Sequence, residues 1–331
     1  MEILRLTIIS LLDLDRLEDS MYSKINRDEE YKHRLLDFIK HEYEVDAISI
    51  TSAKRGFYGE TWRLDTSNSA YFLKLVYAHE YKPVYERSFP VVQHLCDHGI
   101  DFISRIVTTT SNNLYSHFDG ATIGVFDWIE GENTENDATK IDEYKMLAKV
   151  YTVPSCDISM PSENFTNKHA GDFFEKWKRL NDKQTLSLLE RNRLKIEHRA
   201  KRLDVFSKLC CRDTSGFFIT HGDAGGNFLV GHESNFIVDW DSVKLAPPER
   251  DAWFCVHLNW AMVAFHDALK QNNINYELRP ERFAYYCYWF FFYYLNAFLD
   301  AHAEVGIEAE AIEEFIDGWM ANNVEWADGV R

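Results

Sequence analysis

The stretch ITHGDAGGNFLVGHESNFIVDWD, from Ile219 to Asp241, places many carboxylate and amide side chains beside two short apolar runs. The runs FLV (228–230) and FIV (236–238) are typical of β-strands, and the five residues GHESN between them favour a hairpin connection. The polar residues around them either are ordinary turn formers or belong to a functional site that the hairpin supports.

Cross-strand pairing makes the second possibility specific. With Val230 paired to Phe236, Asn227 lies opposite Asp239. Directly opposed residues have Cβ atoms about 4.5–5.5 Å apart, so an amide oxygen and a carboxylate at these positions suit one hard cation. Mg²⁺ takes oxygen ligands, usually with only one or two protein carboxylates. Asp223 lies just upstream and can face the same end of the hairpin.

Composition limits the class of protein. The 331 residues are 46% hydrophobic, which allows a large core in two domains or one bilobal unit. The formal net charge of −17 disfavours nucleic acids and anionic membranes and favours cationic ligands. Six cysteines without a CxxC pair indicate free thiols and a cytoplasmic protein. The tyrosine-rich run at 283–299 is short for a membrane span and predicts a buried aromatic helix.

The chain divides into three segments. Residues 1–45 form an N-terminal appendage that ends in an amphipathic helix, and residues 46–126 are rich in strand patterns. From residue 127 to residue 331 the pattern is helical apart from the quoted hairpin. The sequence thus predicts an α+β protein with a five-stranded sheet, a hinge near 126–131 and a cleft between two lobes. The expected strands are DAISITS, YGETWRLDT, AYFLKLVYA, ISRIVTTT (103–110) and TIGVFDWI, with a helix at 85–100 after the third.

The order H-G-D, then N, then D after a hairpin resembles the aminoglycoside phosphotransferases and their choline-kinase-like relatives, which share the protein-kinase fold. The segment LAPPERDAWF (245–254) and the layout of the helix at 85–100 are similar to the spectinomycin phosphotransferases. The resemblance covers roughly residues 30–331. It implies a small antiparallel sheet lobe that binds a nucleotide and a large, mainly helical lobe that carries the catalytic hairpin and an acceptor pocket.

The resemblance also implies roles for individual residues. Asp223 matches the catalytic aspartate that accepts or orients the proton of the attacking hydroxyl group, and His221 matches the histidine that supports its loop. Asn227 and Asp239 match the Mg²⁺ ligands, in agreement with the pairing argument. Asp251 matches an aspartate that holds the catalytic loop by hydrogen bonds.

The loop departs from the family pattern in its length. Three residues, 224–226, separate Asp223 from Asn227, where the pattern has four. Two of the three are adjacent glycines, whose conformational freedom lets the loop close with one residue fewer. The alternative is a nucleotide-binding pseudoenzyme that has lost turnover.

The strand-rich segment supplies candidates for nucleotide binding. Lys74 lies in the apolar strand YFLKLV, and lysine is rarely buried without a partner. It either protects a sheet edge or pairs with Glu86 on the following helix, as the pair that holds the α- and β-phosphates in a kinase-like fold. Gly56 and Gly59 would let the loop before the second strand approach the phosphates. At the lobe junction, the adenine would meet backbone groups near Asp127 and Ile129.

The predicted function is an ATP- or GTP-dependent O-phosphotransferase, with Mg²⁺, that acts on a cationic aminoglycoside or aminocyclitol as an antibiotic-resistance kinase. A metabolite kinase of the choline or homoserine type is the alternative within the same chemistry. The expected protein is a monomer or weak dimer. The aromatic helix would wall the acceptor pocket and bind an amine through cation–π contacts. Carboxylates near the C-terminus would bind its ammonium groups, and they are Glu304, Glu308, Glu310, Glu313, Glu314 and Asp317.

Overall fold

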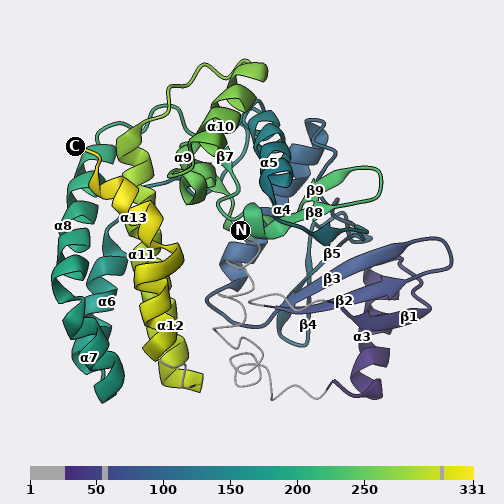
Figure 1. The fold of residues 1–331 in the computed structure, drawn as a ribbon. Coiled ribbons are helices and arrows are strands. Elements are labelled where there is room, and N and C mark those ends of the chain that lie inside the picture. Colours follow the sequence, from purple (N-terminus) through teal and green to yellow (C-terminus); the bar gives the residue numbers. More distant parts are fainter. Residues whose placement is uncertain (1–26, 54–58, 306–308) are drawn as a thin grey trace.

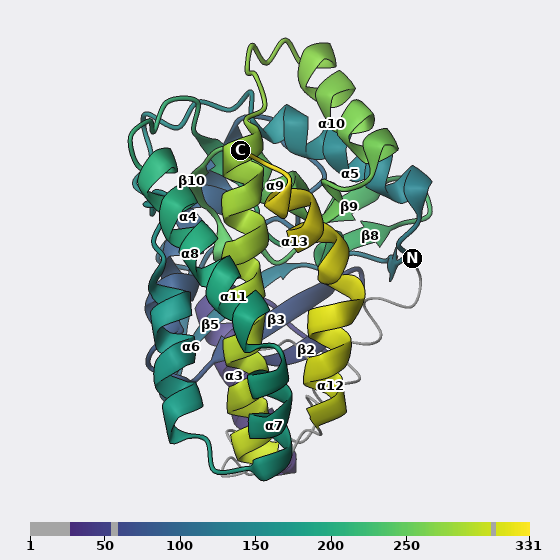
Figure 2. The same cartoon turned by 60° about the vertical axis from the view of Figure 1, so that its left-hand side comes forward.

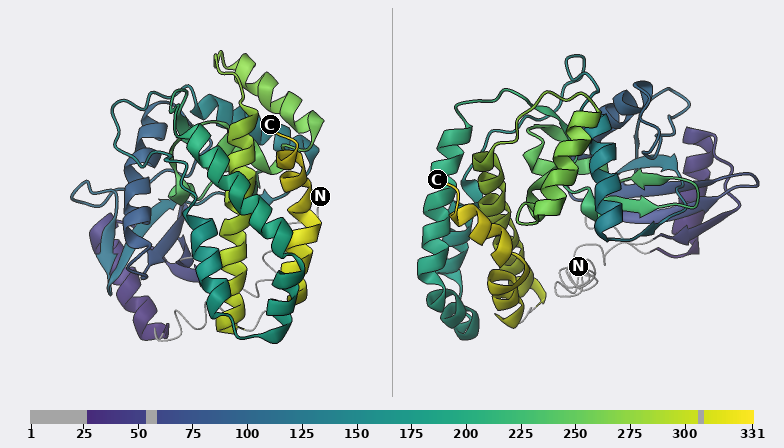
Figure 3. Two further views of the ribbon diagram at one scale, coloured as in Figure 1. Left: turned by 90° about the vertical axis from the view of Figure 1, so that its left-hand side faces the viewer. Right: turned by 45° about the horizontal axis from the view of Figure 1, so that its top comes forward.

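The computed structural model describes residues 27–53, 59–305 and 309–331 of the chain. An antiparallel sheet with helices α3 (Glu29–Tyr43) and α4 (Lys82–Asp97) lies beside a larger part built mainly of helices (Figure 1). The two views of Figure 3 show the same division, with the sheet and α3 on one side and the long helices on the other. The predicted α+β class, with a small sheet part and a large helical part, is confirmed.

The sheet has five strands, all antiparallel, in the order β1-β2-β3-β5-β4. Helix α4 follows the third strand, as expected. The predicted five-stranded antiparallel sheet is therefore confirmed. Its strands are β1 (Ser49–Ser52), β2 (Glu60–Asp65), β3 (Ala70–Val76), β4 (Ser116–Phe118) and β5 (Ala121–Asp127).

The prediction of a full strand at residues 103–110 is wrong. This segment makes one isolated bridge, between Ile106 and Phe126, and Val107 N donates to Val125 O at 2.9 Å. The short strand β4 occupies the same edge of β5 further along. The edge of β5 is thus shared between an irregular segment and the three-residue strand β4. The β-branched residues at 103–110 do not reveal this division.

Alternation along β3 gives the sheet two different faces. Leu73 and Leu75 point toward α3 and share a buried cluster with Leu35 and Ile39 of that helix. Asp28 caps α3, since its side chain accepts a hydrogen bond from Tyr31 N. The predicted amphipathic helix at the end of residues 1–45 therefore packs as part of the sheet. The other face of β3 carries Lys74 and is turned toward the helical part.

Helix α4 connects the two parts. Near its start, Tyr85 and Phe89 pack with Val76 of the sheet. Near its end, its side chains belong to the large buried core of the helical part; these are Val91, Val92 and Leu95. The sheet and the helices therefore share apolar contacts through one helix, although the sequence suggests separate lobes.

The helical part is arranged around the long helix α11 (Pro280–Val305), beside which α6, α7, α8 and α12 run lengthwise (Figure 2). Amphipathic patterns and caps define the shorter helices. Asn136, for example, forms a capping box with Thr139 at the start of α5. The helices are α5 (Asp137–Val150), α6 (Lys168–Arg179), α7 (Lys183–Arg191), α8 (Arg193–Cys210), α9 (Glu249–Ala252), α10 (Asn259–Gln271), α12 (Ala309–Glu314) and α13 (Ala321–Asp328), with a π-helical turn η4 (Phe315–Trp319).

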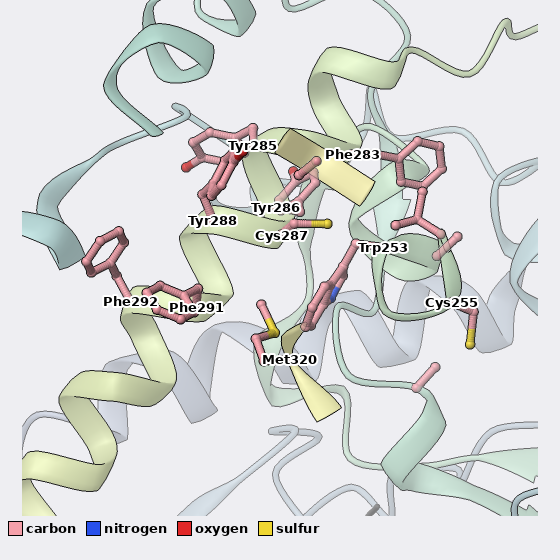
Figure 4. Close-up of a cluster of buried hydrophobic side chains, with 14 of the residues drawn as sticks. Trp253, Cys255, Phe283, Tyr285, Tyr286, Cys287, Tyr288, Phe291, Phe292 and Met320 are labelled. Atoms are coloured by element: carbon pink, nitrogen blue, oxygen red, sulfur yellow. The ribbon is translucent and has the colours of Figure 1, made fainter. Parts of the chain in front are cut away.

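Helix α11 is the predicted aromatic helix. Tyr285, Tyr286, Tyr288, Phe291 and Phe292 are buried along it, and Figure 4 shows them from the same helix. The burial of these rings explains the unusual composition of residues 283–299. No helix among the residues that the structure describes is long and apolar enough to cross a membrane.

Short strands carry the hairpin that the sequence analysis singled out. Residues 128–131 lead from β5 into β6, which pairs with β8, and β8 pairs with β9. A separate two-stranded ladder joins β7 to β10 on either side of this hairpin. The strands are β6 (Glu132–Asn133), β7 (Phe218–Thr220), β8 (Phe228–Val230), β9 (Asn235–Ile237) and β10 (Lys244–Ala246); 3₁₀ turns lie at η1 (Gly225–Asn227), η2 (Trp240–Ser242) and η3 (Trp253–Cys255).

The hairpin forms with a register one residue away from the predicted one. Val230 pairs with Asn235, not with Phe236, so the connection is a four-residue turn closed by Gly231 N donating to Ser234 O. Phe228 pairs with Ile237 as a consequence. The apolar runs are too short and too similar for sequence alone to fix their alignment.

Candidate active site

The loop between β7 and β8 is fixed through its backbone by Asp251 on α9. One carboxylate oxygen of Asp251 accepts hydrogen bonds from His221 N at 3.2 Å and from the Tyr151 hydroxyl at 2.7 Å. The other oxygen accepts a hydrogen bond from Gly222 N. Asp251 therefore makes the loop-holding contacts that the family resemblance implies.

His221 links this loop to the end of the hairpin. Its ring is fully buried, with Nε2 2.9 Å from Val238 O and Nδ1 3.2 Å from Asp223 N. Since a backbone N–H must donate and a carbonyl must accept, Nδ1 is the acceptor and Nε2 carries the proton. Burial lowers the pKa of His221, which fits this neutral form. The ring ties the backbone of Asp223 to the residue that precedes Asp239.

Gly222 is required by both conformation and space. Its φ is +86°, and a Cβ there would lie 2.1 Å from Nη2 of Arg250. The Arg250 guanidinium is buried, donating to Thr220 Oγ1 at 2.9 Å and to Ser242 O at 2.8 Å. It therefore joins the strand before the catalytic loop to the turn after Asp239.

We expect Gly222→Ala to destabilise the protein more than Gly99→Ala. Gly99 also has a positive φ, of +79°, but a Cβ there would meet nothing within 4 Å. Left-handed strain costs both variants about 1–3 kcal/mol. Displacing Arg250 from its buried acceptors costs the Gly222 variant roughly 1–3 kcal/mol more. Urea unfolding of both variants measures the difference. Equal free energies of unfolding for the two variants would show that moving Arg250 does not destabilise the protein.

The short segment between Asp223 and Asn227 closes as a 3₁₀ turn. Asn227 N donates to Ala224 O at 2.8 Å, which uses fewer residues per turn than an α-helix does. Neither Gly225 nor Gly226 has a positive φ, so the unusual glycine conformations that we expected are not the reason for closure. The Asn227 amide donates to Asp223 O at 2.7 Å and to Asp223 Oδ2 at 3.3 Å. The shorter loop thus keeps these two side chains in contact.

Lys74 does not pair with Glu86, and that prediction is wrong. Its Nζ donates to Asp239 Oδ1 at 2.9 Å and to Asp241 Oδ2 at 2.6 Å, both from the helical part. Tyr85 is the α4 residue that faces Lys74, with its ring centroid 5.3 Å from Nζ. Glu86 follows one position later on the helix, is rotated away by about 100°, and accepts from Thr122 Oγ1 at 2.6 Å.

The Lys74 cluster is strongly charged and only partly shielded. The lysine side chain is 8% exposed, whereas Asp239 and Asp241 are 44% and 27% exposed. Burial alone would lower the pKa of Lys74, but the two carboxylates outweigh it and raise that pKa. Burial raises the pKa of Asp241, whereas the Lys74 charge overcomes the effect of burial on Asp239 and lowers its pKa. A pair of carboxylates open to solvent therefore faces a buried ammonium group.

These oxygens suit a hard cation, although the predicted geometry was wrong. Asn227 lies opposite Val238, whose N donates to Asn227 O at 2.9 Å, and Asp239 follows with a left-handed φ of 61°. Two carboxylates and one amide are the kind of donors that Mg²⁺ accepts, with phosphates and water beside them. That these carboxylates hold an ammonium group shows that the site accommodates positive charge. In the described part of the chain no three His, Cys, Asp or Glu side chains gather as a metal cluster.

Asp241 is the residue that the sequence analysis missed. Its signal was the second carboxylate in VDWD, two positions after Asp239. The 3₁₀ turn η2 brings both carboxylates to Lys74, since a strand continuing through Asp241 would have run past it. The left-handed conformation of Asp239 starts this turn.

The structure describes three of the other four residues expected near the nucleotide. Gly59 packs against β3, where a Cβ would lie 2.9 Å from Leu75 O and 3.3 Å from Lys74 Cγ, and its role toward phosphates stays a prediction. Gly56 lies outside the described residues. Asp127 N donates to Arg105 O, and Asp127 O accepts from Ser104 Oγ. Asp127 O can accept a second hydrogen bond, so the backbone groups near Asp127 and Ile129 both stay predicted contacts for the base.

Comparison with known proteins identifies the chain. A model of the phosphotransferase enzyme family matches residues 49–286, a range that contains Lys74, Asp223, Asn227 and Asp239. The chain belongs to this family. A search of curated proteins found no significant match.

Solved structures support the fold of this phosphotransferase. A spectinomycin phosphotransferase in complex with ADP and spectinomycin has a TM-score of 0.68 at 20% identity, over 90% of this chain and 97% of that one. A protein solved with GDP and kanamycin has a TM-score of 0.57 at 13% identity, over 89% and 97% of the two chains. A choline kinase from Streptococcus pneumoniae has a TM-score of 0.57 at 12% identity, over 88% and 100%. The phosphotransferase therefore shares the protein-kinase-like fold of these structures.

The carboxylates near the C-terminus of the phosphotransferase do not gather as an acceptor site, contrary to expectation. Glu310 accepts from Gln184 Nε2 at 2.7 Å, and Asp317 lies 2.8 Å from Lys195 Nζ. Glu313 lies 3.4 Å from Arg191. These contacts fasten α12 and η4 to α7 and α8 at the surface of the helical part. Glu314 is exposed, whereas Glu308 and the side chain of Glu304 lie outside the described residues.

Proposed function

We propose that the protein transfers the γ-phosphoryl group of ATP or GTP to a hydroxyl group of a small cationic molecule, with an aminoglycoside or aminocyclitol as the favoured class. The observation that carries this proposal is the contact of Lys74, from the sheet, with Asp239 and Asp241, from the helical part. His221 connects this cluster to Asp223 through two hydrogen bonds. Groups suited to hold phosphates, a cation and a hydroxyl group therefore lie around one interface.

Each residue then has a defined task. Lys74 would bind the α- and β-phosphates, while Asn227 and Asp239, with Asp241, would hold Mg²⁺. When bound, Mg²⁺ supplies positive charge that offsets the charge on the phosphates. Asp223 accepts the proton of the acceptor hydroxyl group while the hydroxyl oxygen forms a bond to the γ-phosphorus. The bond from the γ-phosphorus to the bridging oxygen breaks, and the nucleoside diphosphate leaves with the electron pair.

Cationic acceptors are favoured by charge and by aromatic surface. Trp253, two residues after Asp251, stacks on Phe290 of α11 with ring centroids 4.3 Å apart. One turn along α11, the partly exposed ring of Tyr294 stacks on Phe290 with ring centroids 6.0 Å apart. An ammonium group over such rings gains about 0.5–2 kcal/mol. This aromatic face, together with the net charge of −17, replaces the C-terminal carboxylates as the basis for a cationic substrate.

A choline-type metabolite is the second candidate. Aromatic rings bind quaternary ammonium groups well, and the same face of α11 would serve that purpose. The solved structure of a choline kinase shows that the fold accommodates such an enzyme. Assaying aminoglycosides, aminocyclitols, choline and homoserine with both ATP and GTP separates these classes. Nucleotide binding without transfer to any acceptor would instead favour the pseudoenzyme.

The cysteines bear on the compartment in which the enzyme works. All six cysteines lie in the described part of the chain and none forms a disulfide. Free thiols fit a reducing compartment. We therefore propose a cytoplasmic enzyme, a monomer or weak dimer, that needs neither nucleic acid nor a membrane.

We expect acceptor binding to require positive charge and to weaken with salt. Attraction between an ammonium group and a carboxylate-rich site is screened beyond a Debye length of about 8 Å at physiological ionic strength. The measurement is KM for the best acceptor at low and high salt, beside KM for its N-acetylated analogue. Equal KM values for the charged and acetylated forms would remove the cationic-substrate proposal and leave the phosphotransferase chemistry in place.

A further inference from the structure

Helix α5 carries a buried ion pair that the proposed chemistry does not use. Lys140 Nζ lies 2.7 Å from Glu143 Oε2, and the two side chains are only 14% and 3% exposed. On the same helix, Lys145 and Asp142 form a pair with the same spacing, at 2.9 Å, but that pair is exposed. Since burying charges is costly, a buried pair calls for a reason that the exposed pair does not.

The buried pair lies against the catalytic loop. A Cβ at Gly225 would lie 2.8 Å from Lys140 Nζ and 3.7 Å from Glu143 Oε2. Gly225 has no positive φ, so the contact with Lys140 concerns space and not backbone conformation. The ammonium group of Lys140 thus fills the volume that a side chain would occupy in the middle of the shortened turn.

The chain just before α5 holds the same turn from a second point. The Asn133 amide donates to Gly226 O at 3.0 Å and to Phe228 O at 2.9 Å. The capping box of Asn136 and Thr139 fixes the start of α5 between these two contacts. The segment from residue 133 to residue 143 is therefore a brace along the loop that connects Asp223 to Asn227.

Charge explains why the brace ends in an ammonium group. Besides Glu143, the carboxylate of Glu135 comes within 3.5 Å of the Cβ position at Gly225. Burial raises the pKa of Glu143, and the charges of Glu135 and of Asp251, which holds the loop backbone, raise it further. With like charges so close, the carboxylates repel one another. An ammonium group at Gly225 opposes this repulsion.

We propose that Lys140, held by Glu143, is a positioning residue for phosphoryl transfer, and that its charge keeps the three-residue turn in the shape that places Asp223 beside Asn227. The inference rests on the proposed function of Asp223 and Asn227. The segment 224–226 is one residue shorter than the family pattern. Lys140, which lies outside the loop, supports the turn in place of the missing residue.

The first test compares three variants with wild type. Lys140→Met removes the charge and keeps most of the length of the side chain. Because a 1 Å displacement at a reacting centre costs up to about 10²-fold, we expect kcat to fall about 10–100-fold. The nucleotide KM should change by less than about twofold, since the variant alters a step after binding.

Lys140→Met should also lower Tm by leaving Glu143 buried and unpaired, and Lys140→Met with Glu143→Gln should restore Tm while kcat stays low. Lys145→Met is the matched control and should leave kcat and Tm near wild type.

The second test does not depend on turnover. Hydrogen–deuterium exchange of the apo protein should be faster across residues 222–228 in the double variant than in wild type or Lys145→Met. Recovery of both kcat and Tm in the double variant would overturn the inference, since the pair would then be only structural. Unchanged exchange, or equal kcat in Lys140→Met and Lys145→Met, would overturn it as well. Failure of the proposed function appears separately, as a wild-type protein that phosphorylates no acceptor.

Discussion

Asp223→Asn is expected to fold, to bind nucleotide as the wild type does, and to lose kcat by about 10²–10⁴-fold, the usual cost of a lost general base. The shape of the loop comes from the bonds of Asp251 to the backbone of His221 and Gly222, which the substitution leaves in place. The Asp223 side chain is exposed and so is accessible to an acceptor hydroxyl group. The effect should therefore fall on the chemical step alone.

Three measurements establish this result for Asp223→Asn. Steady-state kinetics with the best acceptor give kcat, isothermal titration gives the nucleotide Kd, and a thermal melt reports folding. Asp142→Asn, an exposed carboxylate of α5, serves as the control and should match wild type in all three. A folded Asp223→Asn protein with wild-type kcat would show that another group receives the proton.

Asp239→Ala is expected to abolish the Mg²⁺ dependence of nucleotide binding. Two unit charges about 4 Å apart interact by about 4 kcal/mol at an effective dielectric constant near 20, so the loss of one carboxylate ligand lowers affinity by about 10²–10³-fold. Lys74 keeps Asp241 as its partner at 2.6 Å, so the variant should not leave a buried charge unpaired. Asn227→Ala should weaken the same dependence less, because an amide carries no charge.

The measurement for Asp239→Ala is the nucleotide Kd over a Mg²⁺ titration. Metal dependence should decrease in the order wild type, Asn227→Ala, Asp239→Ala only if both side chains are ligands and the carboxylate contributes more. Identical titration curves for wild type and Asp239→Ala would remove Asp239 from the metal site. Lys74 and Asp223 would keep their proposed roles in that case.

The sequence predicted the elements well because their signals are local. The apolar run YFLKLV placed Lys74 on a strand, and the amphipathic pattern at the end of residues 1–45 marked helix α3. The aromatic run at 283–299 was correctly separated from a membrane span because tyrosine is frequent in it. Each of these features depends on residues within a few positions of one another.

The errors concern relations between distant segments. Glu86 lies at a plausible distance along the chain from Lys74, but rotation of α4 by one residue turns Tyr85 toward the lysine instead. The one-residue shift of the hairpin moved Val238, not Asp239, opposite Asn227. Orientation of a helix and register of a short ladder are set by tertiary packing, which one sequence does not display.

The electrostatic expectation failed for a related reason. Net charge predicts attraction of cations to the whole molecule but does not say where carboxylates point. Glu313 and Asp317 are paired with cations of neighbouring helices. The carboxylates proposed for the site, Asp223, Asp239 and Asp241, lie instead within residues 219–241, and the turn η2 directs the last two toward Lys74.

Helix α4 belongs to two buried cores, and this affects how the protein unfolds. Tyr85 and Phe89 pack against the sheet, whereas Leu95 packs in the core of the helical part. Melting either half would strip this helix of one set of neighbours and expose apolar surface that the other half cannot cover. The chain should thus unfold cooperatively, in one calorimetric transition, and a proteolytic cut near residue 127 would not release two autonomous fragments.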